Sequence, residues 1–410
     1  MTTAKTKSFR PTGFQAWLAA LGILIGIGVA GMVFILVNGL STTNLTDLVP
    51  WGLWITIDLS SIALSAGAFL FCAAVYLIGI RELQPLARTA AYIGLIGYGM
   101  AMMCLLMDIG RPDRFWHGFV FWNVHSVLWE VTMCVGLYFS VLVLENLPNL
   151  ARWDWFRTKL PKLAEKLEKM HSIAPYLAVA GLCLSMLHQS SLGATYGVLI
   201  ARPIWYRPGL AALFIISAGA GGMAMTLLAT WIVGKLQPES NVREDLMDKV
   251  SRFLGWWLVG YLYLRFWDAF AMTYTHQPGR EEGLSLLTNG PLAINFWFGE
   301  LLLGIIVPVL ILLNNKLRQT PLARTMAYVL IIGGVVAYRW DTNLVGQLIV
   351  QTPIQMKDAL LFTSYTPASI EIIISVGIVS IGLLLFTLGA KYLRIVDHNP
   401  SPAGQHSPAD

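Results

Sequence analysis

The sequence is poor in charged residues. Asp, Glu, Lys and Arg make up only 12% of its 410 residues, whereas 56% are hydrophobic and the mean hydropathy is +0.63. Soluble proteins of this length carry charge on about a quarter of their residues. The composition therefore excludes the ordinary soluble classes and predicts an integral membrane protein.

Cysteine is scarce as well, and its positions exclude several cofactors. The four cysteines lie inside apolar runs and form no CxxC or CxxCH motif: Cys72, Cys104, Cys134 and Cys183. A zinc site, a covalent c-type haem or a thiolate-held iron–sulfur cluster needs clustered Cys or His ligands. We therefore expect no metal site and no covalently bound cofactor in this chain.

The excess of basic residues does not indicate a nucleic-acid partner. The 28 Lys and Arg residues against 23 Asp and Glu give a net charge of +5, but they lie in the segments between apolar runs. Nucleic-acid binding needs basic residues gathered on one face. We expect the lipid bilayer as a partner, and no nucleic acid.

Ten apolar runs are long enough to cross a membrane, which takes about 20 residues each. They cover approximately residues 14–40, 51–80, 87–109, 124–147, 173–201, 209–236, 250–276, 292–313, 323–345 and 368–395. We therefore expect an all-α polytopic membrane protein in which residues 1–410 form a single integral membrane domain with ten transmembrane helices.

The linkers indicate the orientation. If the N-terminus is cytoplasmic, most Lys and Arg residues fall on its side, including the run from Arg152 to Lys169, and few fall on the other side. The positive-inside rule then places both termini in the cytoplasm, and an even number of spans agrees. We expect a multi-pass protein of the bacterial cytoplasmic (inner) membrane, with 396–410 as a polar cytoplasmic tail. Residues 151–170 either dock a partner or, as we favour, lie on anionic lipid.

A repeated short sequence suggests two related helix bundles. The sequence SAGA occurs at 65–68 in the second run and at 217–220 in the sixth. This four-helix offset predicts two four-helix bundles plus flanking helices. The alternative is that small residues recur only because they pack helices closely. A second repeated sequence, PLARTAAY at 85–92 and PLARTMAY at 321–328, is offset by six helices and conflicts with the first.

Several ionisable residues lie where lipid is expected. Each costs roughly 2.5–3.5 kcal/mol to insert, so each needs a partner, a wet cavity or a function. The proton-transfer candidates are Glu130, Asp108, Glu300, Arg265, Asp268, Arg339 and Glu371. Such a set is typical of a proton path, although a transporter would show it too. Arg265 and Asp268 are three residues apart and are also expected to neutralise one another.

Histidine is informative because it is rare. Only His188 lies in the middle third of a run, beside Gln189, whereas His125 lies at the start of another run. A two-haem cytochrome b needs four axial ligands within its helices and is excluded. A neutral imidazole suits a quinone, because it can donate a hydrogen bond and exchange protons. A single haem and a helix-packing histidine remain alternatives. Asp58, with Trp54 one turn before it, is the other candidate for this site.

The motifs together resemble the ten-span branch of the polysulfide reductase (NrfD/PsrC) integral membrane subunits, which includes the membrane subunit of hydrogenase-2-type complexes. The motifs are PWGLWITID (50–58), MDIGRPDRFW (107–116), NVHSVLWEVTMC (123–134), LHQSSLG (187–193), RPIW (202–205), LRFWD (264–268), FWFGELL (296–302), AYRW (337–340) and YTPASIE (365–371).

The resemblance implies a cofactor-free, quinone-reactive subunit. It assigns Asp58 and His188 to the quinone region and matches the intramembrane polar positions Glu130, Arg265, Glu300, Arg339 and Glu371. Asp268 stands where hydrogenase-type relatives carry Glu, and His125 stands where they often carry Asn. These two departures affect the proton route.

The sequence therefore predicts the quinone-reactive membrane anchor of a multisubunit respiratory oxidoreductase. Menaquinone or ubiquinone would react in this chain, with quinone-binding residues Asp58, His188, Trp54, Gln189 and His125. Electrons would pass through a ferredoxin-like iron–sulfur subunit, and through it a catalytic subunit, on the periplasmic side. Proton translocation is a further expectation. The alternatives are a secondary transporter and a mono-haem b-type anchor.

Overall fold

The structure, a computed structural model, describes residues 12–274, 276–354 and 357–396. Its long elements are α1 (Gly13–Asn38), α2 (Leu53–Leu64) continued by α3 (Gly67–Tyr76), α4 (Gln84–Asp108), α6 (Val127–Leu150), α9 (Ala174–Gly197), α10 (Gly209–Leu236), α11 (Glu244–Thr273), the π-helix η6 (Asn295–Ile306) continued by α13 (Val307–Leu313), α15 (Pro321–Leu348) and α16 (Ser369–Leu388). The prediction of an all-α polytopic protein is confirmed.

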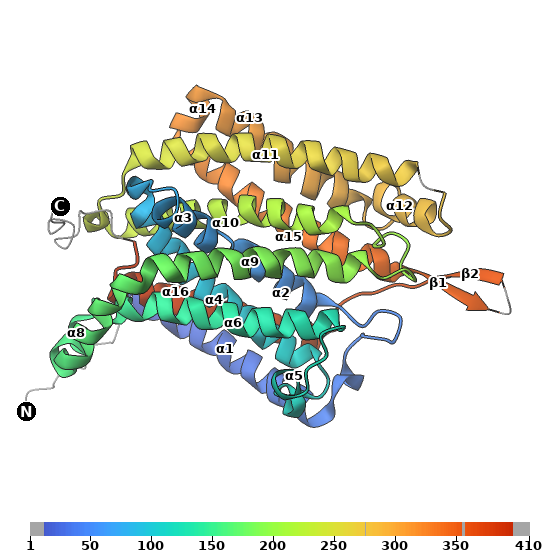
Figure 1. The fold of residues 1–410 in the computed structure, drawn as a ribbon, viewed down its shortest axis with the longest axis horizontal. Coiled ribbons are helices and arrows are strands. Elements are labelled where there is room, and N and C mark those ends of the chain that lie inside the picture. The colour runs from blue at the N-terminus through green and yellow to red at the C-terminus, as the bar shows by residue number, and fades with distance from the viewer. Residues whose placement is uncertain (1–11, 275, 355–356, 397–410) are drawn as a thin grey trace, which may run out of the picture.

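Shorter elements connect the long helices. They are α5 (His117–Val120), α7 (Asp154–Lys159), α8 (Pro161–Lys169), α12 (Arg280–Thr288), α14 (Asn315–Gln319), the π-helical turn η7 (Gly389–Leu393) and 3₁₀ turns at Leu40–Thr42, Arg81–Leu83, Pro112–Arg114, Met170–Ile173 and Pro238–Ser240. Two antiparallel strands, β1 (Ile349–Ile354) and β2 (Lys357–Phe362), form a hairpin that projects beyond the helices (Figure 1).

Nine helices in the described part of the chain are long and apolar enough to cross a membrane. They correspond to nine of the ten expected runs. The remaining run, 250–276, falls within α11, which at 30 residues is long enough to span but is rich in Trp, Tyr and charged residues. A tenth span at α11 therefore stays a prediction.

The long helices pack as two groups. The first bundle contains α2, α3, α4, α6 and α9, and the second contains α10, α11, η6, α13 and α15. Helices α1 and α16 pair with each other and flank the first bundle against α4 (Figure 1). The division into two four-helix bundles plus flanking helices stays a prediction, because α10 also packs closely against α9 and α2.

The seam between the bundles explains one of the small-residue motifs. A Cβ atom added to Gly67 in α3 would lie 2.6 Å from the carbonyl oxygen of Gly222 in α10. Only glycine permits this backbone approach. The first SAGA segment therefore has a packing role at the seam. The second run is also interrupted there, between Leu64 and Gly67, whereas α10 is continuous.

The start of α1 and the end of the α16 segment lie at the same end of the bundle. The indole N–H of Trp17 donates to the hydroxyl of Thr387 at 3.2 Å, and the Lys391 ammonium lies 3.7 Å from the Phe14 ring centroid. Helix α8 projects from this end (Figure 1). We call it the proximal end, and we call the opposite end, with α5, α12 and the β-hairpin, the distal end.

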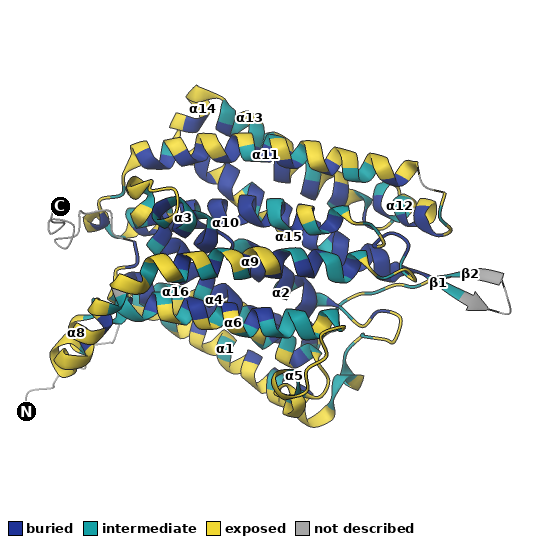
Figure 2. Cartoon of the chain, viewed as in Figure 1, coloured by how far each residue is buried: buried dark blue, intermediate teal, exposed yellow. Residues whose placement is uncertain are grey.

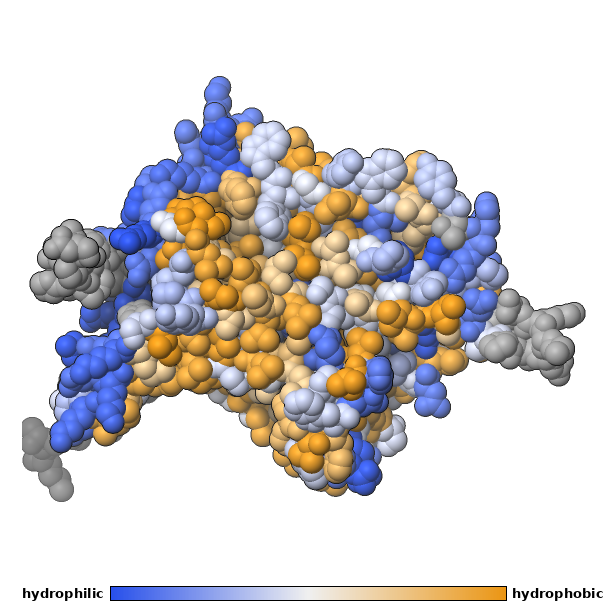
Figure 3. Space-filling view, viewed as in Figure 1, coloured by the Kyte–Doolittle hydropathy of each residue, from blue (hydrophilic) through white to orange (hydrophobic). Residues whose placement is uncertain are grey.

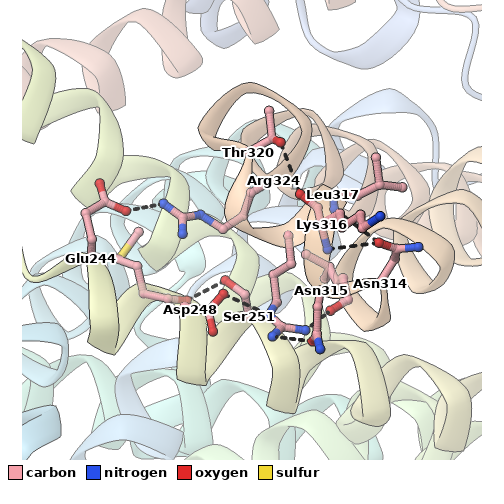
Figure 4. A network of polar contacts seen from close by, with 12 residues as sticks. Glu244, Asp248, Ser251, Asn314, Asn315, Lys316, Leu317, Thr320 and Arg324 are labelled. Carbon is pink, nitrogen blue, oxygen red and sulfur yellow. Dashed lines mark hydrogen bonds and ion pairs between the residues drawn. The ribbon is translucent and has the colours of Figure 1, made fainter.

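Ion pairs between buried arginines and more exposed carboxylates join helices at the proximal end of the second bundle. Figure 4 shows Arg324 of α15 bonded to Glu244 of α11. The guanidinium of Arg318 donates to Asp248 at 2.8 Å and to the carbonyl oxygen of Leu312 at 3.0 Å. These bonds join α11, α14 and α15.

The surface has the pattern of a membrane protein. Apolar residues form a broad band across the middle of the face in Figure 3, with hydrophilic residues at both ends. The long helices turn their buried stripes inward and their exposed stripes outward (Figure 2). The outward stripe of α1 includes Ile23 and Val37, which are largely exposed. The expected tail, 396–410, lies outside the described residues apart from Val396.

Candidate functional site

A cavity of about 780 Å³ lies in the first bundle, between α2, α4, α6 and α9 and the α5 segment. Most of its lining is apolar or aromatic. The polar side chains in its wall are Asp58, Asp108, Thr132, His188, Thr195 and Tyr196. An apolar cavity with a few convergent polar groups is typical of a small-molecule site.

The cavity reaches the lipid-facing surface between α4 and α6. Met102 and Leu106 of α4 line it, yet each is 38% exposed, and Leu128 of α6 is 60% exposed. The α5 segment covers the distal part of this opening, because the ring of Phe119 lies against Gly136 of α6. The cavity therefore opens sideways to lipid, beneath an aromatic cover.

His188 is fully buried in the cavity wall, and neither of its ring nitrogens has a hydrogen-bond partner among the described residues. The aromatic ring of Tyr98 lies against the imidazole, with 5.6 Å between the two ring centroids. Buried polar atoms are rarely left unpaired, so each such atom needs an explanation. A ligand in the cavity would provide a partner.

Two carboxyl groups face the same cavity with unpaired oxygens. Asp58 lies in the second turn of α2 and is 3% exposed, whereas Asp108 is the last residue of α4. One oxygen of each is buried without a hydrogen-bond partner. Helices α2 and α4 pack side by side, so the two groups approach the cavity from neighbouring helices.

The other expected quinone residues lie outside the cavity lining. The indole N–H of Trp54 donates to the carbonyl oxygen of Glu371 at 3.2 Å, on the α16 side of α2. The amide of Gln189 donates to the carbonyl oxygen of Ile62 at 3.1 Å. His125 is exposed in the loop before α6. The structure thus brings Asp58 and His188 together and adds Asp108.

A second polar cluster lies in the distal half of the second bundle. The Arg265 guanidinium bonds both oxygens of Glu300, at 2.5 and 3.2 Å, and also bonds Asp268 at 3.1 Å. Arg207 binds the other oxygen of Asp268 at 2.8 Å. Glu300 lies in the π-helix η6 and is buried. Arg265 and Asp268 therefore do neutralise one another.

Arg339 and Asp341 of α15 border this region. Arg339 is fully buried and donates to the Phe214 carbonyl oxygen and the Ser217 hydroxyl, both at 3.1 Å. Its other two nitrogens have no hydrogen-bond partner among the described residues, and the guanidinium lies 3.7 Å from the Phe214 ring centroid. Asp341 accepts from Asn295 at 2.8 Å, and its second oxygen has no partner. Asp341 is not among the expected proton-transfer residues.

Glu130 and Glu371 lie apart from both sites. Glu130 is half-buried and accepts from the thiol of Cys134 at 3.2 Å. Glu371 accepts from the backbone N–H groups of Asn44 and Ala368 and from the hydroxyl of Tyr365. Glu371 therefore caps the start of α16. Glu130 and Glu300 therefore have different surroundings.

Sequence reasoning missed a line of polar side chains that leads from the proximal end to His188. A small cavity of about 60 Å³ at the proximal end is lined by Glu145 of α6. Tyr138 lies two turns further along α6, its ring 4.7 Å from that of Tyr98. The hydroxyls of Tyr98 and Tyr138 both lie close to the buried hydroxyl of Ser185. Tyr138 and Glu145 are seven residues apart and Ser185 and His188 are three apart, so each pair shares a helix face. This spacing is the sequence feature that could have identified them.

Comparisons with known proteins give consistent results. A family model described as "Polysulphide reductase, NrfD" matches residues 41–351. The integral membrane subunit of a menaquinone reductase from Nitratidesulfovibrio vulgaris is 33% identical, over 93% of this chain and 92% of the relative. A subunit of a selenate reductase from Mesobacillus selenatarsenatis is 24% identical, over 93% of this chain and 94% of the relative.

A third relative is the probable Ni/Fe-hydrogenase 2 b-type cytochrome subunit from Escherichia coli, which is 26% identical over 94% of this chain and 95% of its own. All the residues that line the large cavity fall within the part of the chain that the family model matches.

Proposed function

Because the chain belongs to the NrfD polysulphide reductase family, we propose that it is the quinone-reactive membrane anchor of a respiratory oxidoreductase complex. The observation that carries this proposal is the lipid-facing cavity that holds His188 and Asp58, both with unpaired polar atoms. The names of the relatives, which are subunits of reductases, support it.

The cavity suits a quinone in size and chemistry. Its volume of about 780 Å³ lies within the range of roughly 300–1,000 Å³ usual for small-molecule sites. The apolar wall suits the ring and the isoprenoid tail, and the opening between α4 and α6 lets the tail extend into lipid. The unpaired nitrogens of His188 suit a carbonyl oxygen of the headgroup.

The chemistry needs electrons and protons. Reduction of a quinone to a quinol adds two electrons and two protons. His188 would donate a hydrogen bond to one carbonyl oxygen, while Asp58 and Asp108 would exchange protons with the headgroup. We assign the electrons to a partner subunit with iron–sulfur clusters, as the family resemblance implies. Menaquinone is the favoured quinone, because the 33% identical relative is named a menaquinone reductase.

The partner would dock at the distal end. Asp58 and Asp108 lie near the distal ends of their helices, so the headgroup would lie closer to this end. The positive-inside rule favours a periplasmic distal end and cytoplasmic termini, because Lys and Arg are concentrated at the proximal end. A reporter inserted near Gly283 in α12 tests the orientation, and a cytoplasmic signal from it would contradict the proposal.

Protons would reach His188 from the proximal side. The side chains of Glu145, Tyr138, Ser185 and Tyr98 form the line that leads to it. Protons taken up opposite the electron donor would make the reaction contribute to the membrane potential. Roles for Glu130, Arg265, Asp268, Glu300, Arg339 and Glu371 in proton transfer stay predictions, and the ion pairs of Arg265 favour a structural role for Glu300.

A photoreactive quinone analogue tests the cavity directly. Illumination of the intact complex should label peptides of α2, α4 or α9, and an excess of unmodified quinone should prevent the labelling. Labelling confined to helices outside the first bundle would overturn the proposal.

The two alternatives have less support. A transporter built from parallel repeats needs interrupted helices at matching places, but the interruption after Leu64 has no counterpart in the continuous α10. The haem alternative is favoured by the name of the E. coli relative. A reduced-minus-oxidised spectrum of the purified chain decides it, because an α-band would establish a b-type haem.

A further inference from the structure

Two amides of α15 hold one wall of the large cavity. Asn343 and Gln347 lie one turn apart, and both are fully buried. They bond the backbone at the start of α2 and the side chain of Tyr196 in α9. Trp51 and Tyr196 both line the cavity, with their rings 5.4 Å apart. A helix of the second bundle thus fixes a wall of the site in the first.

Backbone groups determine which way the Gln347 amide faces. Its Oε1 accepts from the backbone N–H of Trp51 at 3.0 Å, and its Nε2 donates to the carbonyl oxygens of Trp51 and Asn343, at 2.7 and 2.8 Å. A backbone N–H can only donate and a carbonyl oxygen can only accept. The opposite amide orientation would lose all three bonds.

The same reasoning orients Asn343. Its Nδ2 donates to the carbonyl oxygens of Trp51 and Gly52, at 2.9 and 3.2 Å. Its Oδ1 therefore faces the other way, 3.3 Å from the Gln347 Nε2 and 3.1 Å from the Tyr196 hydroxyl oxygen. An amide oxygen can only accept, so the Tyr196 hydroxyl must donate its proton to Asn343.

This assignment limits what Tyr196 can offer a ligand. A phenol has one proton, and with that proton given to Asn343 only the oxygen lone pairs remain. The carbonyl oxygens of a quinone can only accept hydrogen bonds, whereas the hydroxyl groups of a quinol can donate them. A tyrosine that only accepts can bond the quinol but not the quinone.

We propose that Asn343 and Gln347 lock Tyr196 as a hydrogen-bond acceptor in the cavity wall, and that this lock favours the quinol over the quinone. The inference rests on the proposed function, because it assumes that the cavity binds the headgroup. Tyr196 is then a binding residue, and Asn343 is a positioning residue that acts through it.

Separate dissociation constants for the two redox forms test the lock. The constants are measured by anaerobic equilibrium dialysis of a short-tailed naphthoquinone and its quinol against the intact complex. Asn343→Leu frees the Tyr196 proton, so the quinone should bind about two- to tenfold more tightly while quinol binding stays unchanged. Tyr196→Phe should weaken quinol binding by a similar factor and leave quinone binding unchanged.

The double variant shows whether Asn343 acts through Tyr196. In the Tyr196→Phe background, Asn343→Leu should change neither dissociation constant. The matched control is Asn146→Leu. Asn146 is also a buried amide, which donates to the carbonyl oxygens of Ala91 and Leu142 at 3.0 and 2.8 Å, and it lies outside the cavity lining. This control should leave both constants unchanged.

Several results would overturn the lock. One is an Asn343→Leu variant with the quinone affinity of the unmodified protein. A second is weaker quinone binding by the Tyr196→Phe variant, because Tyr196 would then be a hydrogen-bond donor to the quinone. A third is a Tyr196→Phe variant in which neither dissociation constant changes. Tyr196→Phe keeps the test valid if Asn343→Leu fails to assemble. If the unmodified complex binds neither form, the proposed function itself fails, and that outcome is distinct.

Discussion

His188 and Asp58, from the fifth and second expected spans, line one cavity, and each has buried polar atoms without a hydrogen-bond partner in the part of the chain that the structure describes. The side chains reach it from α9 and α2, on either side of a space that opens to lipid between α4 and α6. Unpaired atoms of this kind are costly in a protein that lacks a ligand. The predictions below follow from a quinone headgroup that satisfies them.

Asp58→Asn should slow quinone turnover. The amide keeps the size of the side chain but removes the proton that the carboxyl group exchanges. We expect turnover to fall by about a hundredfold or more, with a smaller effect on the affinity for a headgroup-directed inhibitor. Steady-state kinetics and inhibitor titration measure the two effects. Asp154→Asn, at the exposed proximal end, is the control, and equal turnover in both variants would show that Asp58 transfers no proton.

Leu106→Trp should obstruct the opening between α4 and α6. The larger ring would occupy the path of the isoprenoid tail, so the KM for a long-tailed quinone should rise while the KM for a short-tailed analogue stays unchanged. Ile23→Trp, on the lipid-facing surface of α1, controls for added bulk. If both KM values rise together, the tail does not leave the cavity by this route.

Glu145→Gln should slow proton delivery. The variant retains hydrogen bonding but removes the titrating group of the proximal cavity. In vesicles that contain the complex, the rate of proton uptake from the proximal side should fall together with turnover, whereas quinone affinity should not change. A pH-sensitive dye in that compartment gives the measurement. Glu165→Gln, in the exposed α8, should behave like the unmodified protein, and an unaffected Glu145→Gln variant would remove this residue from the route.

Arg265→Met should destabilise the protein. It leaves Glu300 buried without its ion-pair partner, while Asp268 keeps Arg207. Breaking a buried ion pair in this way costs about 3–5 kcal/mol of the free energy of unfolding. The double variant Arg265→Met/Glu300→Met should recover part of that loss. Thermal unfolding in detergent measures it, with Lys169→Met as an exposed ion-pair control that changes stability by about 0–1 kcal/mol. An Arg265→Met variant as stable as the control would contradict a structural ion pair.

The sequence was sufficient to predict where the long helices lie, but not which of their residues face one another. Apolar runs predicted the positions of the long helices to within a few residues, because lipid demands apolar length. The π-helical turns of η6 and the interruption after Leu64 left no such signal. His188 and Gln189 were assigned together, yet adjacent residues on a helix cannot share a face, and Gln189 bonds α2 instead.

Residues defined by tertiary contact were also missed. Asn343 and Gln347 are ordinary amides in the sequence, and their role depends on the contact between α15 and the start of α2. Likewise, Tyr98 and Tyr138 belong to apolar runs and become notable only because their hydroxyls meet at Ser185 and the Tyr98 ring lies against His188. Periodicity describes one helix at a time, and these arrangements involve several.

The most direct test of the account is electron transfer to quinone in the intact complex with His188→Ala. The partner's clusters are reduced by an artificial donor, and their reoxidation by added quinone is followed by absorbance. Ser190→Ala, a partly exposed neighbour on the same helix, is the control. We expect cluster reduction to be normal in both variants and reoxidation by quinone to be lost only in His188→Ala. Unchanged reoxidation in His188→Ala would contradict a quinone site in this cavity.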